Sequence, residues 1–187
     1  KRSFLSTNRP NKLAYVKFTS GSTGEPKGVK ISQASMNNYV KWVIKEFELS
    51  IKDRWSQHPN LSFDLSITDT YGCLTTGGTL FPFIRDTELL LPAEHIRNKK
   101  ITIWNSVPSI VDLMSKLKQI NSKNLSSIRL FNFCGEQLFK SQVQELFNAV
   151  PKVKIRNSYG PTEATVACKS IIFNKKSFKN YKSDTIE

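Results

Sequence analysis

Short apolar runs alternate with amphipathic segments along this chain of 187 residues. The runs rich in strand-forming residues lie at 13–18, 79–83, 101–104, 128–133 and 153–155. Helical patterns lie at 64–74, 88–98, 108–117 and 140–149, and a further helix is predicted to follow a cap at Ser32. Such alternation predicts an α/β fold, with a mainly parallel sheet and flanking helices. Ligands of such folds bind beyond the carboxyl ends of the strands, so polar motifs are expected there.

The two ends of the chain carry separate expectations. The first residue is Lys1, and the only methionines are Met36 and Met114, so we expect a cut or truncated product. Residues 174–187 are polar, basic and poorly patterned, and are expected to form a surface extension or a cut edge. Residues 1–187 are treated as one domain.

The formal net charge is +13, which makes nucleic-acid binding one hypothesis. The lysines are spread singly, apart from a loose cluster between Lys169 and Lys182, and they do not alternate with aromatic residues as a base-stacking surface would. A solvated lysine-rich surface explains the excess better. No apolar run is long enough for a bilayer and no secretory pattern is present, so we expect a cytoplasmic protein. Three widely spaced cysteines without a CxxC pair argue against a disulfide framework and a zinc site.

Residues 19–28 form a loop of three glycines, four hydroxyl residues and Lys27 directly after the first predicted strand. Glycines let backbone N–H groups approach an anion, hydroxyls donate further hydrogen bonds, and lysine adds positive charge. The loop therefore suits phosphate, although a flexible polar turn is the alternative. It is not a Walker A loop, because Pro26 and Gly28 stand where that motif needs glycine and Ser or Thr.

The stretch 13–29 resembles the phosphate-contacting loop of the AMP-forming adenylating enzymes, the superfamily of acyl-CoA synthetases, luciferases and peptide-synthetase adenylation domains. Residues 63–66 (FDLS) resemble its substrate-anchor motif, Gly135 and Glu136 its adenine-side turn, and residues 157–163 (NSYGPTE) its adenine and metal motif. The resemblance covers about residues 13–172. It is strongest to the amino-acid-activating branch, above all the D-alanine:carrier-protein ligases. It implies that the chain is the central part of the large N-terminal domain, without the small C-terminal domain.

The resemblance assigns a nucleotide site for ATP and Mg²⁺. Its expected nucleotide-binding residues are Thr19, Ser20, Gly21, Ser22, Thr23, Gly24, Gly135, Glu136, Asn157, Ser158, Tyr159, Gly160, Pro161 and Thr162. Thr19, Lys27, Thr162 and Glu163 are expected to be catalytic, with Tyr159 against adenine and Glu163 as the Mg²⁺ ligand. A hard cation prefers carboxylate and phosphate oxygens. For Glu163 the alternative is a carboxylate that only stabilises a helix start.

Asp64 is the residue that indicates an amino-acid substrate, because its carboxylate can pair with an α-ammonium group that fatty acids lack. The alternative is a helix N-cap. By the same resemblance the substrate pocket is lined by Asp64, Leu65, Thr68, Asn105, Asn132, Cys134, Ser158, Val166 and Ala167. Cys134 limits the room, or is a buried small hydrophobe. Thr68, Asn105 and Asn132 make the pocket polar, so small and short polar amino acids are expected, with D-alanine, serine and cysteine ahead of any aromatic.

The sequence therefore predicts ATP-dependent activation of an amino acid to aminoacyl-AMP and transfer to the phosphopantetheine thiol of a carrier protein. This chain alone is expected to be inactive. An acyl-CoA or aryl-acid ligase is one alternative, and a non-catalytic basic module that binds nucleotide or nucleic acid is the other. His58 and His95 are expected to be structural or exposed and without partners, and the three tryptophans to be core or strand-end residues.

Overall fold

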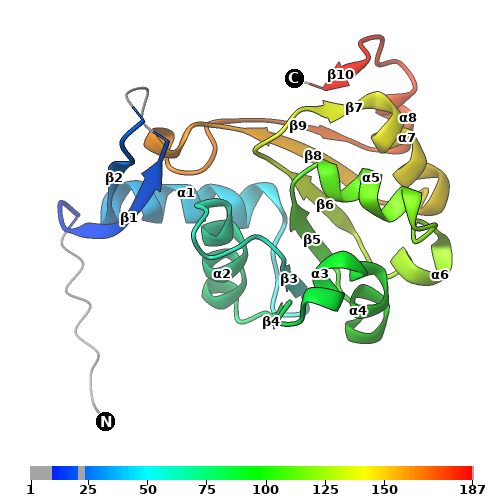
Figure 1. The fold of residues 1–187 in the computed structure, drawn as a ribbon, viewed down its shortest axis with the longest axis horizontal. Helices are drawn as coiled ribbons and strands as arrows, with labels where there is room; N and C mark the ends of the chain where they lie inside the picture. The colour runs from blue at the N-terminus through cyan, green and yellow to red at the C-terminus, as the bar shows by residue number, and fades with distance from the viewer. Residues whose placement is uncertain (1–9, 21–23, 187) are drawn as a thin grey trace.

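The structure, a computed structural model, describes residues 10–20 and 24–186. Its centre is a six-stranded sheet in the order β4-β3-β5-β6-β8-β9 (Figure 1). These strands are β3 (Arg54–Gln57), β4 (Thr79–Pro82), β5 (Ile103–Ser106), β6 (Leu130–Phe133), β8 (Lys154–Tyr159) and β9 (Lys169–Phe173). Pairing is parallel except for β9, which is antiparallel to β8. The expected mainly parallel sheet is confirmed.

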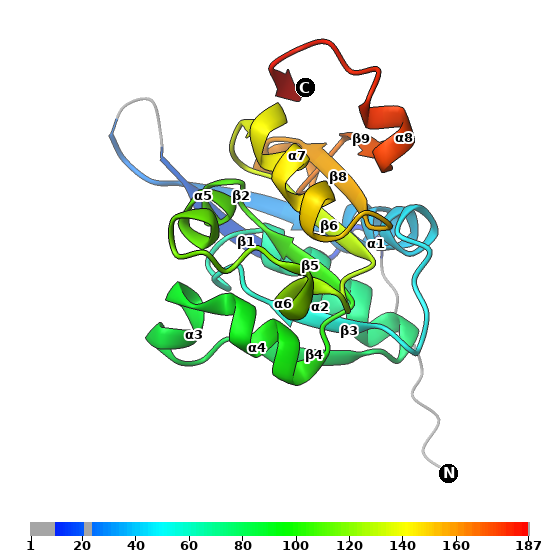
Figure 2. The same cartoon turned by 90° about the vertical axis from the view of Figure 1, so that its right-hand side faces the viewer.

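Helices cover both faces of this sheet (Figure 2). The side chains of α1 (Gln33–Glu46) and α2 (Leu65–Thr76) join one apolar cluster, and those of α4 (Pro92–Lys99), α5 (Ser109–Lys116) and α7 (Lys140–Ala149) join the other. Adjacent strand residues point to opposite faces, so Ile103 packs in the first cluster and Trp104 in the second. Among the described residues no helix is long and apolar enough to cross a membrane.

The first predicted strand exists but lies outside this sheet. It is β1 (Leu13–Thr19), which pairs only with β2 (Lys27–Ser32) in a two-stranded antiparallel hairpin. A short glycine-rich connection favours such a hairpin between neighbouring strands, and the sequence reading missed β2. The Nζ of Lys17 donates to the carbonyl of Leu61, which joins the hairpin to the loop before α2.

Several predicted helices are confirmed, with boundaries set by single residues. The Oγ of Ser32 accepts a hydrogen bond from the Ser35 amide at 3.1 Å and caps α1. The helix at 140–149 is α7, as predicted. The predicted helix at 88–98 is instead two helices, α3 (Asp86–Leu90) and α4, because Pro92 disfavours a helical conformation at Leu91.

Strand boundaries were less accurate. β3 was missed, because it has only four residues with polar ends, although its Trp55 and Ser56 are fully buried. The run predicted at 153–155 continues as β8 to Tyr159, so Asn157, Ser158 and Tyr159 are the last residues of a strand and do not follow it.

Residues 174–186 are mostly exposed, as expected of a surface segment, but they are more regular than their sequence pattern indicated. They form α8 (Lys175–Phe178) and β10 (Thr185–Ile186), and β10 pairs antiparallel with β7 (Leu138–Phe139). Phe178 and Ile186 are each 2% exposed and belong to the second apolar cluster, to which α6 (Ser122–Leu125) also contributes. Few apolar residues, widely spaced, hold this segment, so its pattern was too sparse to read.

Candidate active site

The carboxyl ends of the four central parallel strands meet at one edge of the sheet. The residues directly after β3, β5, β6 and β8 are His58, Val107, Cys134 and Gly160, and all four line one cavity of about 410 Å³. We call it the second cavity, and the cavity beside it, described next, the first cavity. Its other lining residues are Pro59, Asn60, Phe63, Asp64, Leu65, Ser106, Gly135, Glu136 and Val166. The residues that follow these strands therefore gather at one edge of the sheet, where folds of this class bind ligands.

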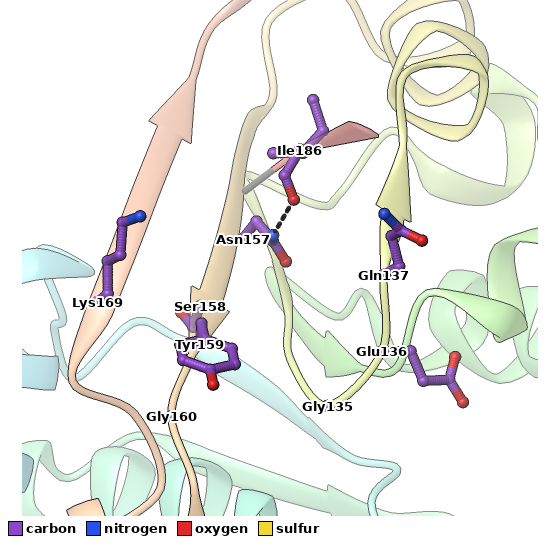
Figure 3. A pocket seen from close by; sticks show the side chains of 9 residues that line it. All are labelled: Gly135, Glu136, Gln137, Asn157, Ser158, Tyr159, Gly160, Lys169 and Ile186. Atoms are coloured by element: carbon purple, nitrogen blue, oxygen red, sulfur yellow. Dashed lines mark hydrogen bonds between the residues drawn. The ribbon is translucent and has the colours of Figure 1, made fainter. Parts of the chain in front are cut away.

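An adjoining cavity of about 530 Å³ lies between the turn after β6 and the end of β8 (Figure 3). This is the first cavity. It is lined by Gly135, Glu136, Gln137, Asn157, Ser158, Tyr159, Gly160, Lys169 and Ile186. Three residues, Gly135, Glu136 and Gly160, line both cavities, so the two spaces share a wall.

The shared wall depends on two glycines. Gly135 has a φ of +92°, which favours glycine. A Cβ added to Gly160 would lie 2.6 Å from the Cα of Ala167, so only glycine allows this close approach. The Glu136 carboxylate accepts from the amide of Ser109 at 2.8 Å and from its hydroxyl at 3.1 Å, and Figure 3 shows it directed away from the first cavity. Its geometry indicates that it fixes the turn to the start of α5.

Asp64 is the only acidic residue besides Glu136 among the described residues that line the second cavity. It precedes α2 without a side-chain cap hydrogen bond, which argues against the N-cap alternative. Its Oδ2 is buried and has no hydrogen-bond partner within residues 10–20 and 24–186. Burial raises the pKa of the Asp64 carboxyl, while the Thr162 hydroxyl, the Leu65 amide and the charge of Lys17 oppose that shift. Among the described residues, no cationic side chain forms an ion pair with this carboxylate.

Leu65, Cys134 and Val166 form the apolar wall beside Asp64. Burial, followed by the charge of Asp64, raises the pKa of the Cys134 thiol to about 11, so the thiol is neutral at physiological pH. Cys134 is thus both a buried small hydrophobe and a cavity residue, and its two interpretations do not exclude each other.

Four of the expected pocket residues, Thr68, Asn105, Asn132 and Ser158, are buried and do not line the second cavity. Asn132 Nδ2 donates to Asn105 Oδ1 at 2.6 Å, and Ser158 Oγ donates to Asn132 Oδ1 at 2.8 Å. Asn105 Nδ2 donates to the Leu65 carbonyl at 3.3 Å, and the Thr68 hydroxyl is bonded to that of Tyr39 at 2.7 Å. The polar groups expected to serve a substrate are therefore used inside the protein. Ala167 is buried and lines neither cavity within the described chain.

Residues 157–160 of the motif expected to bind the nucleotide line the first cavity. Tyr159 is 66% exposed there. Asn157 Nδ2 donates to the Ile186 carbonyl at 2.8 Å, and its Oδ1 is buried without a partner among the described residues. This orphaned acceptor fits a ligand that brings a hydrogen-bond donor.

Thr162 and Glu163 lie on the 3₁₀ turn η1 (Thr162–Ala164), which follows Pro161. The Glu163 side chain is exposed. No group of three or more His, Cys, Asp or Glu side chains suited to a metal occurs within the described ranges. A single exposed carboxylate still fits Mg²⁺, which is commonly held by one or two carboxylates together with substrate phosphates.

The glycine-rich loop closes the β1–β2 hairpin. Thr19 pairs with Lys27 across the hairpin, and Gly24 has a φ of +88°. Ser20 and Lys27 are exposed. Gly21, Ser22 and Thr23 lie outside the described residues, so the phosphate role of the whole loop stays a prediction.

The structure adds residues that the sequence reading missed. Gln137, Lys169 and Ile186 line the first cavity, and no sequence motif indicated them. His58 was expected to have no partner, yet its Nδ1 lies 2.9 Å from Ser106 Oγ, and burial lowers its pKa to about 4. The same expectation was wrong for His95, whose Nδ1 lies 3.3 Å from Glu88. Both rings make contacts within the protein, as predicted for structural histidines.

Comparison with known proteins agrees with this geometry. The family model described as AMP-binding enzyme matches residues 3–185. A D-alanine–D-alanyl carrier protein ligase from Staphylococcus epidermidis is 37% identical over 182 residues, which is 95% of this chain and 37% of that protein. One from Listeria welshimeri is 42% identical over 155 residues, 82% of this chain and 30% of that protein. The chain thus spans about a third of the length of the curated relatives it matches.

The solved structures match the fold. A Vibrio cholerae adenylation domain in complex with glycyl-adenosine-5'-phosphate aligns with a TM-score of 0.85 and 34% identity, covering 91% of this chain and 32% of that one. A nonribosomal peptide synthetase structure with bound AMPPNP aligns with a TM-score of 0.77 and 29% identity, covering 87% of this chain and 17% of that one. The fold is that of the N-terminal part of an adenylation domain, and the chain belongs to the AMP-binding enzyme family.

Proposed function

We infer that this chain carries the ATP and amino-acid sites of an enzyme that converts a small amino acid into its aminoacyl-AMP. The observation that carries the proposal is the pair of cavities that share Gly135, Glu136 and Gly160. One holds a buried carboxylate oxygen of Asp64 and the other a buried amide oxygen of Asn157, and neither oxygen has a hydrogen-bond partner among the described residues. A molecule that joins an α-ammonium group to a nucleotide would supply partners to both.

In the second cavity, Asp64 would bind the α-ammonium group. A buried charge is stable only when it is paired, and Oδ2 has no partner in the described chain. The substrate carboxylate would then lie toward the shared wall, where Gly135 and Gly160 have no side chains to obstruct it.

In the first cavity, Tyr159 would stack on the adenine ring and Asn157 Oδ1 would accept a hydrogen bond from the base. The hydroxyl and amide groups of Thr19 to Gly24, with Lys27, would hold the phosphates. The adenine base would thus lie in the first cavity and the phosphates against the hairpin loop.

The reaction needs no protein nucleophile. A substrate carboxylate oxygen attacks the α-phosphorus of ATP, a new O–P bond forms, and the bond to pyrophosphate breaks with its electron pair leaving on pyrophosphate. The protein would align these two groups through Asp64 and Tyr159, and Thr162 would lie near the α-phosphate. Mg²⁺ held by Glu163 would neutralise phosphate charge when bound. In the second half-reaction a carrier-protein thiol would attack the acyl carbon and release AMP.

The substrate would have a small side chain with little polarity. Leu65, Cys134 and Val166 line the second cavity, whereas Asn105, Asn132 and Ser158 do not line it and hydrogen-bond to one another. Glycine and D- or L-alanine therefore rank ahead of serine and cysteine. This narrows the expectation from the sequence, in which Thr68, Asn105 and Asn132 faced the substrate.

The test is ATP–pyrophosphate exchange by the full-length protein with twenty amino acids, D-alanine, acetate and benzoate. We expect exchange with glycine or alanine and ³²P incorporation that needs Mg²⁺. Exchange with acetate or benzoate, but with no amino acid, would support the acyl or aryl ligase alternative. No exchange with any acid, together with salt-sensitive retention of RNA in a filter-binding titration, would support the basic binding module.

A further inference from the structure

Two consecutive β-branched residues after η1 have left-handed backbone conformations. Thr165 has a φ of 61° and Val166 a φ of 72°. Positive φ is uncommon for any residue with a side chain and is an outlier for a β-branched one. Both side chains are buried, with Val166 2% exposed, so neither residue belongs to a free surface loop.

The hydrogen bonds show why Val166 is held in this conformation. The Ala167 amide donates to the Thr165 carbonyl at 2.9 Å, which closes a three-residue turn centred on Val166. A γ-turn with positive φ is rare and strained. The Cys168 amide donates to the Tyr159 carbonyl at 2.9 Å, and the Thr165 amide donates to the Thr162 carbonyl at 3.1 Å. The turn is therefore fixed at both ends.

Gly160 packs closely against the same turn. A Cβ at Gly160 would lie 3.0 Å from the Val166 carbonyl oxygen as well as 2.6 Å from Ala167 Cα. The turn thus packs directly on the backbone of the wall shared by the two cavities.

Glycine would adopt the backbone of residue 166 without steric cost. The chain nevertheless has valine there, and its side chain lines the second cavity with Leu65 and Cys134. Strained residues of this kind persist where the surroundings determine them, and they cluster at ligand-binding sites.

We propose that the strained turn at Val166 is a rigid stop, which holds the valine side chain in the second cavity and limits the size of the amino-acid side chain. The proposal rests on the proposed function and adds to it a source of selectivity that lies in the backbone. A side chain on a relaxed loop could move aside for a larger substrate, whereas this one is fixed by its turn.

The strain is tested by thermal unfolding of Val166→Gly and Val166→Ala in the full-length protein. Both variants lose the valine methyl groups. At ordinary backbone angles glycine is less stable than alanine, but at a φ of 72° the order should reverse. We expect the glycine variant to unfold roughly 2–4 °C above the alanine variant. An alanine variant as stable as the glycine variant, or more stable, would overturn the proposal.

The matched control is Thr165→Gly against Thr165→Ala, because Thr165 has the same backbone strain but lines neither cavity in the described chain. We expect the same order of stability there, with unchanged selectivity.

The selectivity is tested by the ratio of kcat/KM for alanine to that for 2-aminobutyrate. In Val166→Gly and Val166→Ala this ratio should fall about tenfold, whereas Val166→Ile should keep the wild-type ratio. An unchanged ratio would show that the turn does not limit the substrate. If the wild-type protein activates no amino acid, the proposed function fails, while the order of unfolding temperatures still decides whether the turn is strained.

Discussion

Replacing Asp64 with asparagine would remove a negative charge while keeping the shape of the side chain. In the free protein Oδ2 is buried without a partner in the described chain, and an α-ammonium group would supply one. In the variant that ammonium group would enter the second cavity unpaired. An unpaired buried charge costs about 3–5 kcal/mol. Because Asp64 is only partly buried, we expect the lower end, a loss of about 10²-fold in kcat/KM for the amino acid.

The measurement is pyrophosphate exchange by the full-length protein as amino acid and ATP are varied separately. The KM for ATP should change by less than about twofold, because the first cavity does not include Asp64. Burial raises the pKa of this carboxyl, so in the wild type kcat/KM for the amino acid should fall as acidification protonates it. That acid limb should be absent from Asp64→Asn.

The same raised pKa fixes the sign of the stability change. A raised acid pKa means that the folded state loses stability as pH rises from about 4, the unfolded value. Asp64→Asn should therefore unfold at the same temperature as the wild type or above it at pH 7–8, with the difference closing toward pH 4. The matched control is Asp86→Asn, at an exposed helix start, which should leave amino-acid kinetics unchanged. Normal amino-acid use by Asp64→Asn would refute the assignment.

Three further predictions concern other parts of the site. Glu163→Gln should lower kcat on the order of hundreds-fold and shift the Mg²⁺ dependence, whereas the exposed control Glu94→Gln should do neither; equal effects would remove the metal assignment. Gly160→Ala should unfold at lower denaturant concentration than Gly135→Ala, because a Cβ at residue 160 collides with backbone, whereas one at residue 135 makes only an ordinary contact with Val107 at 3.8 Å in a strained conformation; the opposite order in urea titrations would contradict the contact geometry. Asn157→Leu should raise the KM for ATP at least tenfold with little change for the amino acid, since a buried acceptor facing the nucleotide is lost; equal effects on both substrates would argue against two separate cavities.

The alternation of apolar and amphipathic segments predicted the class of fold because parallel strands buried on both faces must be apolar. The same argument could not find β3, whose Arg54 and Gln57 are polar although its middle is buried. Nor could it predict that β1 leaves the sheet. The pattern of apolar residues in a strand indicates which side chains are buried, but it does not indicate which strand is the hydrogen-bonding partner. Here β1 pairs with β2 across the loop.

Sequence motifs drew attention to residues that the structure places at cavities. Asp64 lines the second cavity and Tyr159 the first, and their binding roles stay predictions. The roles of Asn105 and Asn132 were not predictable, because an amide that bonds another amide has the same sequence signature as one that faces a ligand. Ile186 could not be found either, since it acts through its backbone carbonyl, which accepts from Asn157, and any residue type could provide that group.

The shared wall between the two cavities also has an evolutionary consequence. The side chains at Leu65, Cys134 and Val166 belong to one cavity only, and those of Asn157 and Lys169 to the other. If the proposed function holds, substitutions would retune the choice of acid one residue at a time without disturbing the recognition of ATP. Changes to the shared wall would alter both affinities together. The cavity for the acid would then be the adaptable one, because two of the three residues shared with the nucleotide cavity are glycines and carry no side chain.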